Sequence, residues 1–179
     1  MSDKLNLKNL SFLIYGLGAT GNSVINYFQK KNISNYYVWD DNKTFRKKFH
    51  SKTAFNLKKT LKEVDYVVLS PGISLKNTKY KKNLIKFKGK IISDIDLLYL
   101  DNKNFKSIIV TGSNGKSTTC KIIEHLLKKN KFDVVIGGNI GTPVLNIKIK
   151  KKSFFVIEAS SFQLSHSQFI HPNYAILLN

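Results

Sequence analysis

The sequence predicts an α/β fold with two units, each built on a parallel sheet. Two glycine-rich turns lead to this prediction, one at residues 16–21 and one at residues 112–115. Each turn lies between an apolar run typical of a buried strand and a stretch with helical periodicity. Further apolar runs follow both turns, so each turn should open its own series of alternating strands and helices.

The first series starts with the apolar run 11–15, which predicts a strand, and Val24, Ile25 and Phe28 indicate the helix behind the turn. The turn reads Gly-Leu-Gly-Ala-Thr-Gly, which is the glycine spacing of a Rossmann-type phosphate-binding turn. Together these features predict a Rossmann-like parallel-sheet N-terminal domain that binds a nucleotide.

A second strand is expected at residues 36–39, and it ends at Asp40, about twenty residues after the glycine turn, as the dinucleotide pattern requires. Asp40 is therefore a candidate acceptor for a hydrogen bond from a ribose or a base. The alternative is a structural turn that Asp40 shares with Asp41 and Asn42. The glycine pattern does not distinguish NAD, FAD or another nucleotide.

The rest of the first domain is expected to contain a short strand near residues 53–55 and a clear strand at 65–69. That strand ends at the turn Ser-Pro-Gly-Ile, residues 70–73, on the sheet edge where open α/β folds bind ligands. A helix at 80–87, a short strand at 90–93 and a helix capped by Asp94 follow. The polar residues 101–104 are the best candidate linker, so the predicted domains are 1–103 and 104–179.

The second series contains the chain's most informative motif, Thr-Gly-Ser-Asn-Gly-Lys-Ser-Thr at residues 111–118, between the strand 107–110 and a helix. Amides of such a loop and the helix dipole favour an anion, Lys116 can reach a β- or γ-phosphate, and the Ser117 hydroxyl can bind Mg²⁺. The match is incomplete, because Val110 stands where the P-loop pattern has its first glycine. An ordinary helix capped by a Gly-Lys-Ser turn is the alternative.

Two more strands are expected at 132–136 and 154–157. Three glycines around Asn139 follow the first, which indicates backbone close to a ligand or, alternatively, a flexible loop. Glu158 ends the second strand, where an acid after a P-loop commonly binds the nucleotide's Mg²⁺; capping a turn is the alternative. With a last strand at 174–178, this region predicts an incomplete P-loop ATPase α/β domain.

Composition excludes several classes of function. The formal net charge is +19, but Arg46 is the only arginine and the lysines are spread along the chain, so nucleic acid is not an expected partner. Cys120, the single cysteine, should be a small core residue, and the four histidines have no metal-ligand spacing. No apolar stretch is long enough for a membrane span and no signal peptide is apparent, so a cytoplasmic protein is expected.

The motifs occur together in a characteristic order: the glycine turn 16–21, the Ser-Pro-Gly-Ile turn, the loop 112–118, the Gly-Gly-Asn-Ile-Gly run 137–141 and Glu-Ala-Ser-Ser-Phe-Gln-Leu at 158–164. In this order the chain resembles the Mur ligase family. The Ser-Ser-Phe-Gln-Leu run and the Gly-Ser-Asn-Gly-Lys-Ser-Thr form of the loop are most similar to the D-glutamate-adding branch.

The resemblance implies ligands for each domain. The first domain would bind the UDP end of UDP-N-acetylmuramoyl-L-alanine, and the loop of the second would bind ATP. Lys116 and Glu158 would be catalytic, and Ser117 and Glu158 would bind Mg²⁺. The implied ATP-binding residues are Gly112, Ser113, Asn114, Gly115, Lys116, Ser117 and Thr118. The implied contacts with the UDP substrate are Ala19, Thr20, Asp40, Asp41, Gly72, Asn139, Ser160 and Gln163.

The implied reaction is amide-bond formation in peptidoglycan synthesis: the substrate carboxylate attacks the γ-phosphate of ATP, and D-glutamate's amine displaces phosphate from the acyl phosphate. Members of the family continue into a catalytic histidine, a carbamylated lysine and an amino-acid domain. This chain is therefore expected to be an N-terminal portion that is inactive alone, and a monomer is expected. The alternative function is a module that binds UDP or a dinucleotide without turnover. A complete small P-loop NTPase is a poor third, because the second domain offers no seat for adenine.

Overall fold

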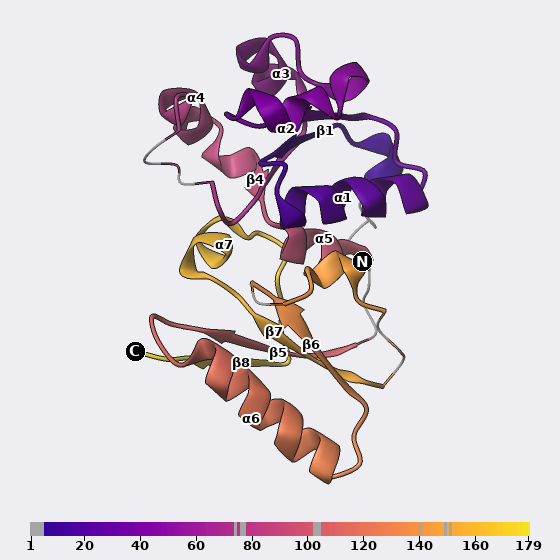
Figure 1. The fold of residues 1–179 in the computed structure, drawn as a ribbon, viewed down its shortest axis with the longest axis vertical. Helices are drawn as coiled ribbons and strands as arrows, with labels where there is room; N and C mark the ends of the chain where they lie inside the picture. The colour runs from indigo at the N-terminus through magenta and orange to yellow at the C-terminus, as the bar shows by residue number, and fades with distance from the viewer. Residues whose placement is uncertain are drawn as a thin grey trace. The chain divides into compact units, whose positions relative to one another are not determined.

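The structure is a computed structural model, and it describes residues 6–73, 75, 78–101, 105–139, 141–148, 150 and 152–179. The chain divides into two compact units, Met1–Asp94 and Ile95–Asn179 (Figure 1). Each unit has its own four-stranded sheet, in the order β2-β1-β3-β4 in the first and β6-β7-β5-β8 in the second. All pairs of neighbouring strands are parallel, which confirms the predicted α/β fold class.

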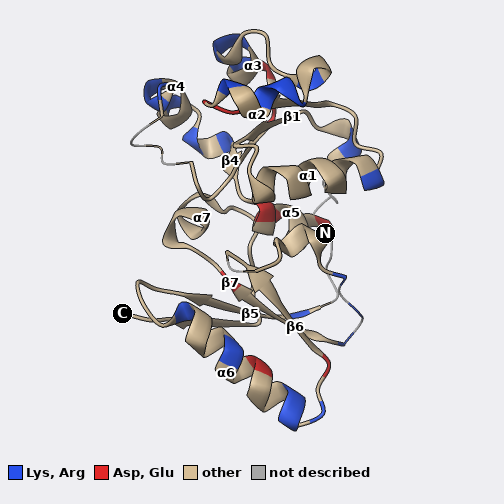
Figure 2. Cartoon of the chain, in the orientation of Figure 1, with Lys and Arg blue, Asp and Glu red and all other residues tan. Residues whose placement is uncertain are grey.

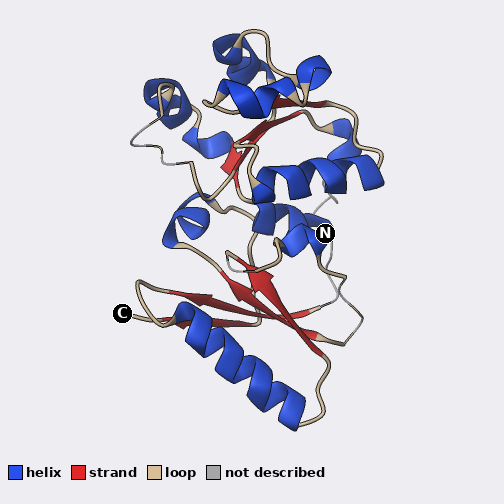
Figure 3. Ribbon diagram, viewed as in Figure 1, coloured by secondary structure: helices blue, strands red, loops and turns tan. Residues whose placement is uncertain are grey.

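The strands of the first unit are short and its helices lie between them in the chain (Figure 3). In chain order the elements are η1 (Leu7–Asn9), β1 (Phe12–Tyr15), α1 (Ala19–Lys30), β2 (Tyr36–Trp39), α2 (Lys43–Lys47), η2 (His50–Lys52), α3 (Leu57–Glu63), β3 (Tyr66–Leu69), α4 (Lys81–Lys86), η3 (Lys88–Lys90) and β4 (Ile91–Ile92).

Strand β1 forms the centre of this unit, and all four of its residues are fully buried. Successive side chains of a strand point to opposite faces, so burial of every residue requires cover on both. Phe12 packs against Phe28 of α1, with ring centroids 4.9 Å apart. Leu13 and Tyr15 belong instead to a core cluster that contains Leu57 of α3. Packing on both faces therefore fixes the end of β1, where the first glycine turn begins.

The segment after β2 differs from the prediction. A strand near 53–55 is wrong: Thr53 forms one isolated bridge with Val38, and the helices α2 and α3 flank it. Asparagine side chains begin both helices, because Asn42 accepts a hydrogen bond from the Thr44 amide and Asn56 accepts one from the Lys59 amide.

The second unit contains α5 (Asp94–Asp101), β5 (Lys106–Thr111), α6 (Lys116–Lys129), β6 (Val134–Gly138), η4 (Val144–Asn146), β7 (Phe154–Glu158), α7 (Ser161–His166) and β8 (Tyr174–Leu177). Helix α6 packs against β5, β6 and β7. Strand β8 is at one edge of the sheet and is largely exposed.

The units divide after Asp94, whereas the sequence placed the boundary between residues 103 and 104. Residues 102–104 lie outside the described part of the chain. The reason for the earlier division is α5, whose Ile95, Leu98 and Tyr99 share a core cluster with Phe155 of β7. Apolar burial therefore assigns this helix to the second sheet, although it comes before the polar stretch in the sequence.

Candidate functional site

The loop 112–115 connects the end of β5 with the start of α6, as the sequence predicts. Gly112 has φ +140°, and a Cβ atom at this position would lie 2.4 Å from the backbone oxygen of Leu178. Both observations exclude a larger residue here without a shift of the backbone. The Ser113 amide donates to the Asn179 oxygen over 3.0 Å, so the loop is also tied to the end of the chain after β8.

Lys116 is the first residue of α6, and its side chain folds back over the loop. The Nζ atom donates hydrogen bonds to the backbone oxygens of Gly112, at 2.7 Å, and Ser113, at 2.9 Å. An ammonium group held by loop carbonyls in this way lies beside the loop amides. Lys116 therefore places positive charge where the loop would receive a phosphate group.

Glu158 lies at the end of β7, the neighbour of β5, with Val110 as its partner in the register. Its side chain is 3% exposed, and the Ser117 hydroxyl donates to its Oε2 atom over 2.9 Å. Asn139, from the loop after β6, donates its amide N–H to the Glu158 backbone oxygen over 2.8 Å. Its Nδ2 atom is 3.5 Å from Oε1 of the same carboxylate. Three segments distant in the sequence thus meet at the ends of adjacent strands.

These groups have the chemistry of a magnesium site. A hydroxyl oxygen and a carboxylate oxygen are the hard ligands that Mg²⁺ prefers, and Mg²⁺ normally keeps several waters beside one or two protein groups. The residues present therefore fit the ion.

Cys120 is buried in α6, near the Glu158 carboxylate. Burial, with a smaller contribution from the Glu158 charge, raises the pKa of its thiol to about 11. Cys120 is thus a core residue without nucleophilic character at neutral pH.

Ser160 and Gln163 follow Glu158 and are used within their own helix. The Ser160 hydroxyl accepts from the Gln163 amide at 3.2 Å, and Gln163 Oε1 accepts from the Ser160 amide at 3.0 Å. This capping box begins α7, and Gln163 is buried. Both side chains therefore stabilise the start of α7, and their contact with a substrate stays a prediction.

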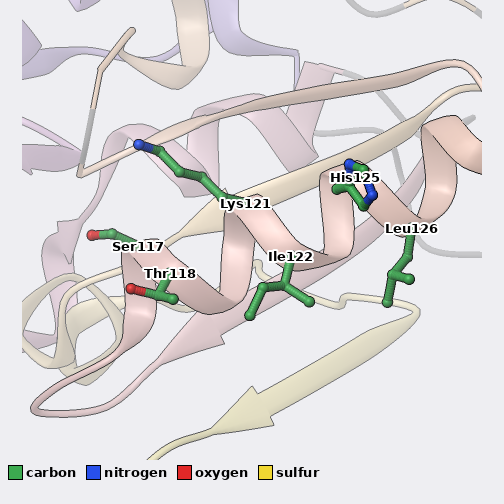
Figure 4. Close-up of a pocket in the computed structure, with 6 residues that line it drawn as sticks. All are labelled: Ser117, Thr118, Lys121, Ile122, His125 and Leu126. Atoms are coloured by element: carbon green, nitrogen blue, oxygen red, sulfur yellow. The ribbon is translucent and has the colours of Figure 1, made fainter.

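A shallow hollow of about 340 Å³ runs along the exposed side of α6 (Figure 4). It begins at Ser117 and Thr118, next to the loop, and continues past Lys121 and His125. Ile122 and Leu126 give it an apolar character, and each is about half exposed. The apolar side of α6 away from the sheet was not predicted, because helical periodicity alone does not distinguish the two faces of an isolated helix.

In the first unit, the ends of three adjacent strands surround the first glycine turn. Gly16 has φ +100°, and a Cβ atom there would lie 2.7 Å from the Cβ atom of Ser70, which follows β3. The Ser70 hydroxyl donates to the Gly16 oxygen over 2.8 Å. This contact brings the Ser-Pro-Gly turn, including the exposed Gly72, next to the glycine turn. Ala19 and Thr20 are the first residues of α1 at the same sheet edge.

Asp40 is 7% exposed and holds the backbone of the glycine turn. Its Oδ2 atom accepts a hydrogen bond from the Leu17 amide at 2.7 Å, and its Oδ1 atom accepts one from the Asn42 amide at 2.8 Å. Both carboxylate oxygens therefore have a backbone partner. The structural role that the sequence offered as the alternative is present in the structure, and a contact with a base or ribose stays a prediction.

Asp41 is part of a network that the sequence did not indicate. Its Oδ1 atom accepts from the Tyr15 hydroxyl at 2.8 Å and from the Trp39 indole at 3.2 Å, and its Oδ2 atom accepts from the Thr78 hydroxyl at 2.9 Å. Burial is the main cause that raises the pKa of Tyr15 well above its ordinary value. No sequence pattern could reveal this network, because Tyr15 reads as an ordinary core residue of a strand and Thr78 lies in an irregular segment.

Comparison with known proteins agrees with this arrangement in both units. The model of the Mur ligase MurD-like N-terminal domain matches residues 10–91, and the model of the Mur ligase middle domain matches residues 110–179. The chain belongs to the Mur ligase family. The two matches correspond to the first sheet and to the sheet that carries the loop 112–115.

Curated relatives match over nearly the whole chain. UDP-N-acetylmuramoylalanine--D-glutamate ligase of Rickettsia prowazekii is 40% identical over 171 residues, which is 93% of this chain and 38% of the relative. The ligases of the same name from Rickettsia felis and Buchnera aphidicola are 42% and 39% identical, again over 93% of this chain, and 37% and 39% of their own lengths are covered. The chain thus spans less than two fifths of the length of these relatives.

Two further observations concern the described residues only. Among them, no helix has the length and hydropathy needed to cross a membrane. They also contain no group of three or more histidine, cysteine or acidic side chains that could hold a metal ion. The magnesium site considered above is different in kind, because it has one carboxylate and one hydroxyl.

Proposed function

We propose that the chain is the nucleotide-binding portion of an ATP-dependent ligase that joins D-glutamate to UDP-N-acetylmuramoyl-L-alanine in peptidoglycan synthesis. The observation that carries the proposal is the hydrogen bond between Ser117 and Glu158 beside the loop 112–115. It supports the proposal because the loop that would bind phosphate lies next to a carboxylate that would bind the metal, as phosphoryl transfer from ATP requires. The relatives' names supply the substrates.

In this proposal each unit has its own ligand. Ala19, Thr20 and Gly72, with Asp40 and Asp41 holding the turns around them, would bind the UDP end of the substrate. Residues 112–118 would bind the phosphates of ATP, and Asn139, Ser160 and Gln163 would contribute to the binding of the muramoyl-alanine part. Mg²⁺ bound by Ser117 and Glu158 would neutralise phosphate charge.

The chemistry follows from these roles. A substrate carboxylate oxygen attacks the γ-phosphorus, and the bond from that phosphorus to the bridging oxygen breaks, which releases ADP. The D-glutamate amine then attacks the acyl carbon, and inorganic phosphate leaves. The first step brings anions together, so Lys116 and the loop amides would stabilise the charge that develops there. Residues outside this chain would complete the reaction, and the cytoplasmic location stays a prediction.

Binding experiments with the 179-residue chain test the two ligands separately. For the UDP substrate, we would compare Gly18→Val with Gly89→Val by calorimetric titration with UDP-N-acetylmuramoyl-L-alanine. A Cβ atom at either glycine meets nothing within 4 Å, so both variants should fold. Only Gly18 lies in the glycine turn, and only its variant should lose binding. Equal binding by both variants, or binding of NAD in place of the UDP compound, would overturn the assignment.

For ATP, Lys116→Ala is compared with Lys129→Ala, which removes the same charge at the other end of α6. We expect Mg-ATP binding to weaken at least about tenfold in the first variant only. Glu158→Gln keeps an acceptor for Ser117 but removes the carboxylate charge, so the remaining binding of ATP should no longer depend on Mg²⁺. Unchanged magnesium dependence in Glu158→Gln would contradict the metal site.

A further inference from the structure

A shallow, open cavity of about 480 Å³ in the first unit is lined by none of the residues assigned to UDP or ATP. Trp39, at the end of β2, lines it, and its side chain packs against the core cluster that contains Leu13 and Tyr15. The cavity is therefore on the face of the sheet that α3 covers, whereas α1 covers the other face. Its volume is within the range of pockets that bind small organic ligands.

Half of the side chains that line this cavity are basic. Lys43, Arg46, Lys47 and His50 line it, and residues 42–62 contain no aspartate or glutamate. Figure 2 shows the lysines and arginine gathered on α2 and the neighbouring helix α3. Among the described residues, none of the four side chains forms an ion pair. Asp41, the nearest acid in the sequence, already accepts three hydrogen bonds.

The only arginine of the chain stacks on its only tryptophan here. The Arg46 guanidinium carbon lies 4.1 Å from the centroid of the Trp39 ring. Stacking holds the guanidinium plane and leaves its N–H groups for an acceptor. At the rim, the Phe55 side chain is fully exposed to solvent. Four uncompensated nitrogen groups next to an exposed aromatic ring suit a ligand with a multiply charged anion and a flat apolar part.

We propose that this cavity is a second nucleotide site, which binds a nucleoside diphosphate with its phosphates against Lys43, Arg46, Lys47 and His50 and its base against Phe55. The site goes beyond the ligase reaction, because it shares no residue with either substrate site.

Trp39 is a built-in reporter, since the chain has no other tryptophan to contribute fluorescence. The assay uses the 179-residue chain carrying Gly18→Val and Lys116→Ala, so that nucleotide binding at the UDP site and at the ATP site is weakened. ADP is titrated while Trp39 emission is recorded. In this background Lys43→Gln/Lys47→Gln is compared with Lys58→Gln/Lys62→Gln, a pair on α3 that removes the same charge outside the cavity. Thermal unfolding followed by circular dichroism shows that each variant is folded.

We expect saturable quenching by ADP that weakens at least about tenfold in the cavity pair and less than about twofold in the α3 pair. Equal weakening in both pairs would show that only the overall field attracts ADP, and would overturn the site. Inorganic pyrophosphate and ADP distinguish the two parts of the ligand. If the base contacts Phe55, pyrophosphate binds more weakly than ADP, and this difference in affinity disappears in Phe55→Ser. Equal affinities for ADP and pyrophosphate in the background chain contradict the assignment of a base to Phe55.

Discussion

Asp40→Ala is expected to unfold the first unit more easily even in the absence of any ligand. The carboxylate accepts hydrogen bonds from the Leu17 and Asn42 amides. Hydrogen bonds to a charged group contribute about 1.5–3 kcal/mol each, and a buried donor left without a partner costs a similar amount. Leu17 is buried, so its amide bears the larger loss, while water can reach the exposed Asn42. Together the two bonds correspond to about 3 kcal/mol.

Urea unfolding followed by Trp39 fluorescence measures this loss, because the tryptophan adjoins Asp40 and reports on the first unit. With a slope of about 1.5 kcal/mol per molar urea, a loss of about 3 kcal/mol lowers the midpoint by about 2 M. Asp40→Asn keeps one acceptor and should lose about half as much. The control is Glu63→Gln, which removes an exposed charge 3.8 Å from Lys59 and should change the free energy of unfolding by less than about 0.5 kcal/mol.

A midpoint for Asp40→Ala within about 0.3 M of the unsubstituted chain would refute this reasoning. Asp40 would then be free to act mainly on a ligand, and loss of UDP-substrate binding in the variant would report a direct contact. If the midpoint falls as expected, the same loss of binding reports a disordered glycine turn. Stability therefore has to be measured before binding data on this variant can be interpreted.

Three other perturbations have defined outcomes. Gly112→Ala should destabilise the second unit by about 1–3 kcal/mol in thermal unfolding, because the φ of +140° and the nearby Leu178 oxygen oppose a side chain. The control is Gly18→Ala, which has open space around its Cβ atom and should cost less than about 1 kcal/mol. Cys120, with its pKa raised to about 11, should resist a thiol reagent at pH 8 and react after unfolding in urea; rapid reaction in the folded chain would contradict its burial. Burial raises the pKa of Tyr99 to about 12 against an ordinary 10.0. The stability that the neutral hydroxyl contributes is therefore complete below pH 10 and is lost as the pH rises to 12. Tyr99→Phe should reduce this loss of stability at alkaline pH, measured as the fall in melting temperature.

Local pattern determined much of the fold. Apolar runs and the two glycine turns predicted strands β1, β3, β5 and β7 close to their observed bounds, since buried strands of parallel sheets are short, continuous and apolar. The positions of the loop 112–115 and of Glu158 could be predicted as well, whereas their role in binding a nucleotide stays a prediction. Loop chemistry is local, and strands of a parallel sheet end at the same edge, so an acid at a strand end comes close to the loop if the two strands are neighbours.

Tertiary structure decided what no local pattern contains. The core cluster with Phe155 placed α5 in the second unit, although the polar stretch behind it resembled a linker. Asparagine caps at Asn42 and Asn56 begin the helices α2 and α3, which flank the residues where a strand was expected. The hydrogen bonds of Asp41 to Tyr15 and Thr78 join residues 26 and 37 positions apart. The stacking of Arg46 on Trp39 joins a helix to the strand before it. Such contacts depend on chain folding in three dimensions, so the sequence by itself could offer Asp40 and Asp41 only as ligand or turn residues.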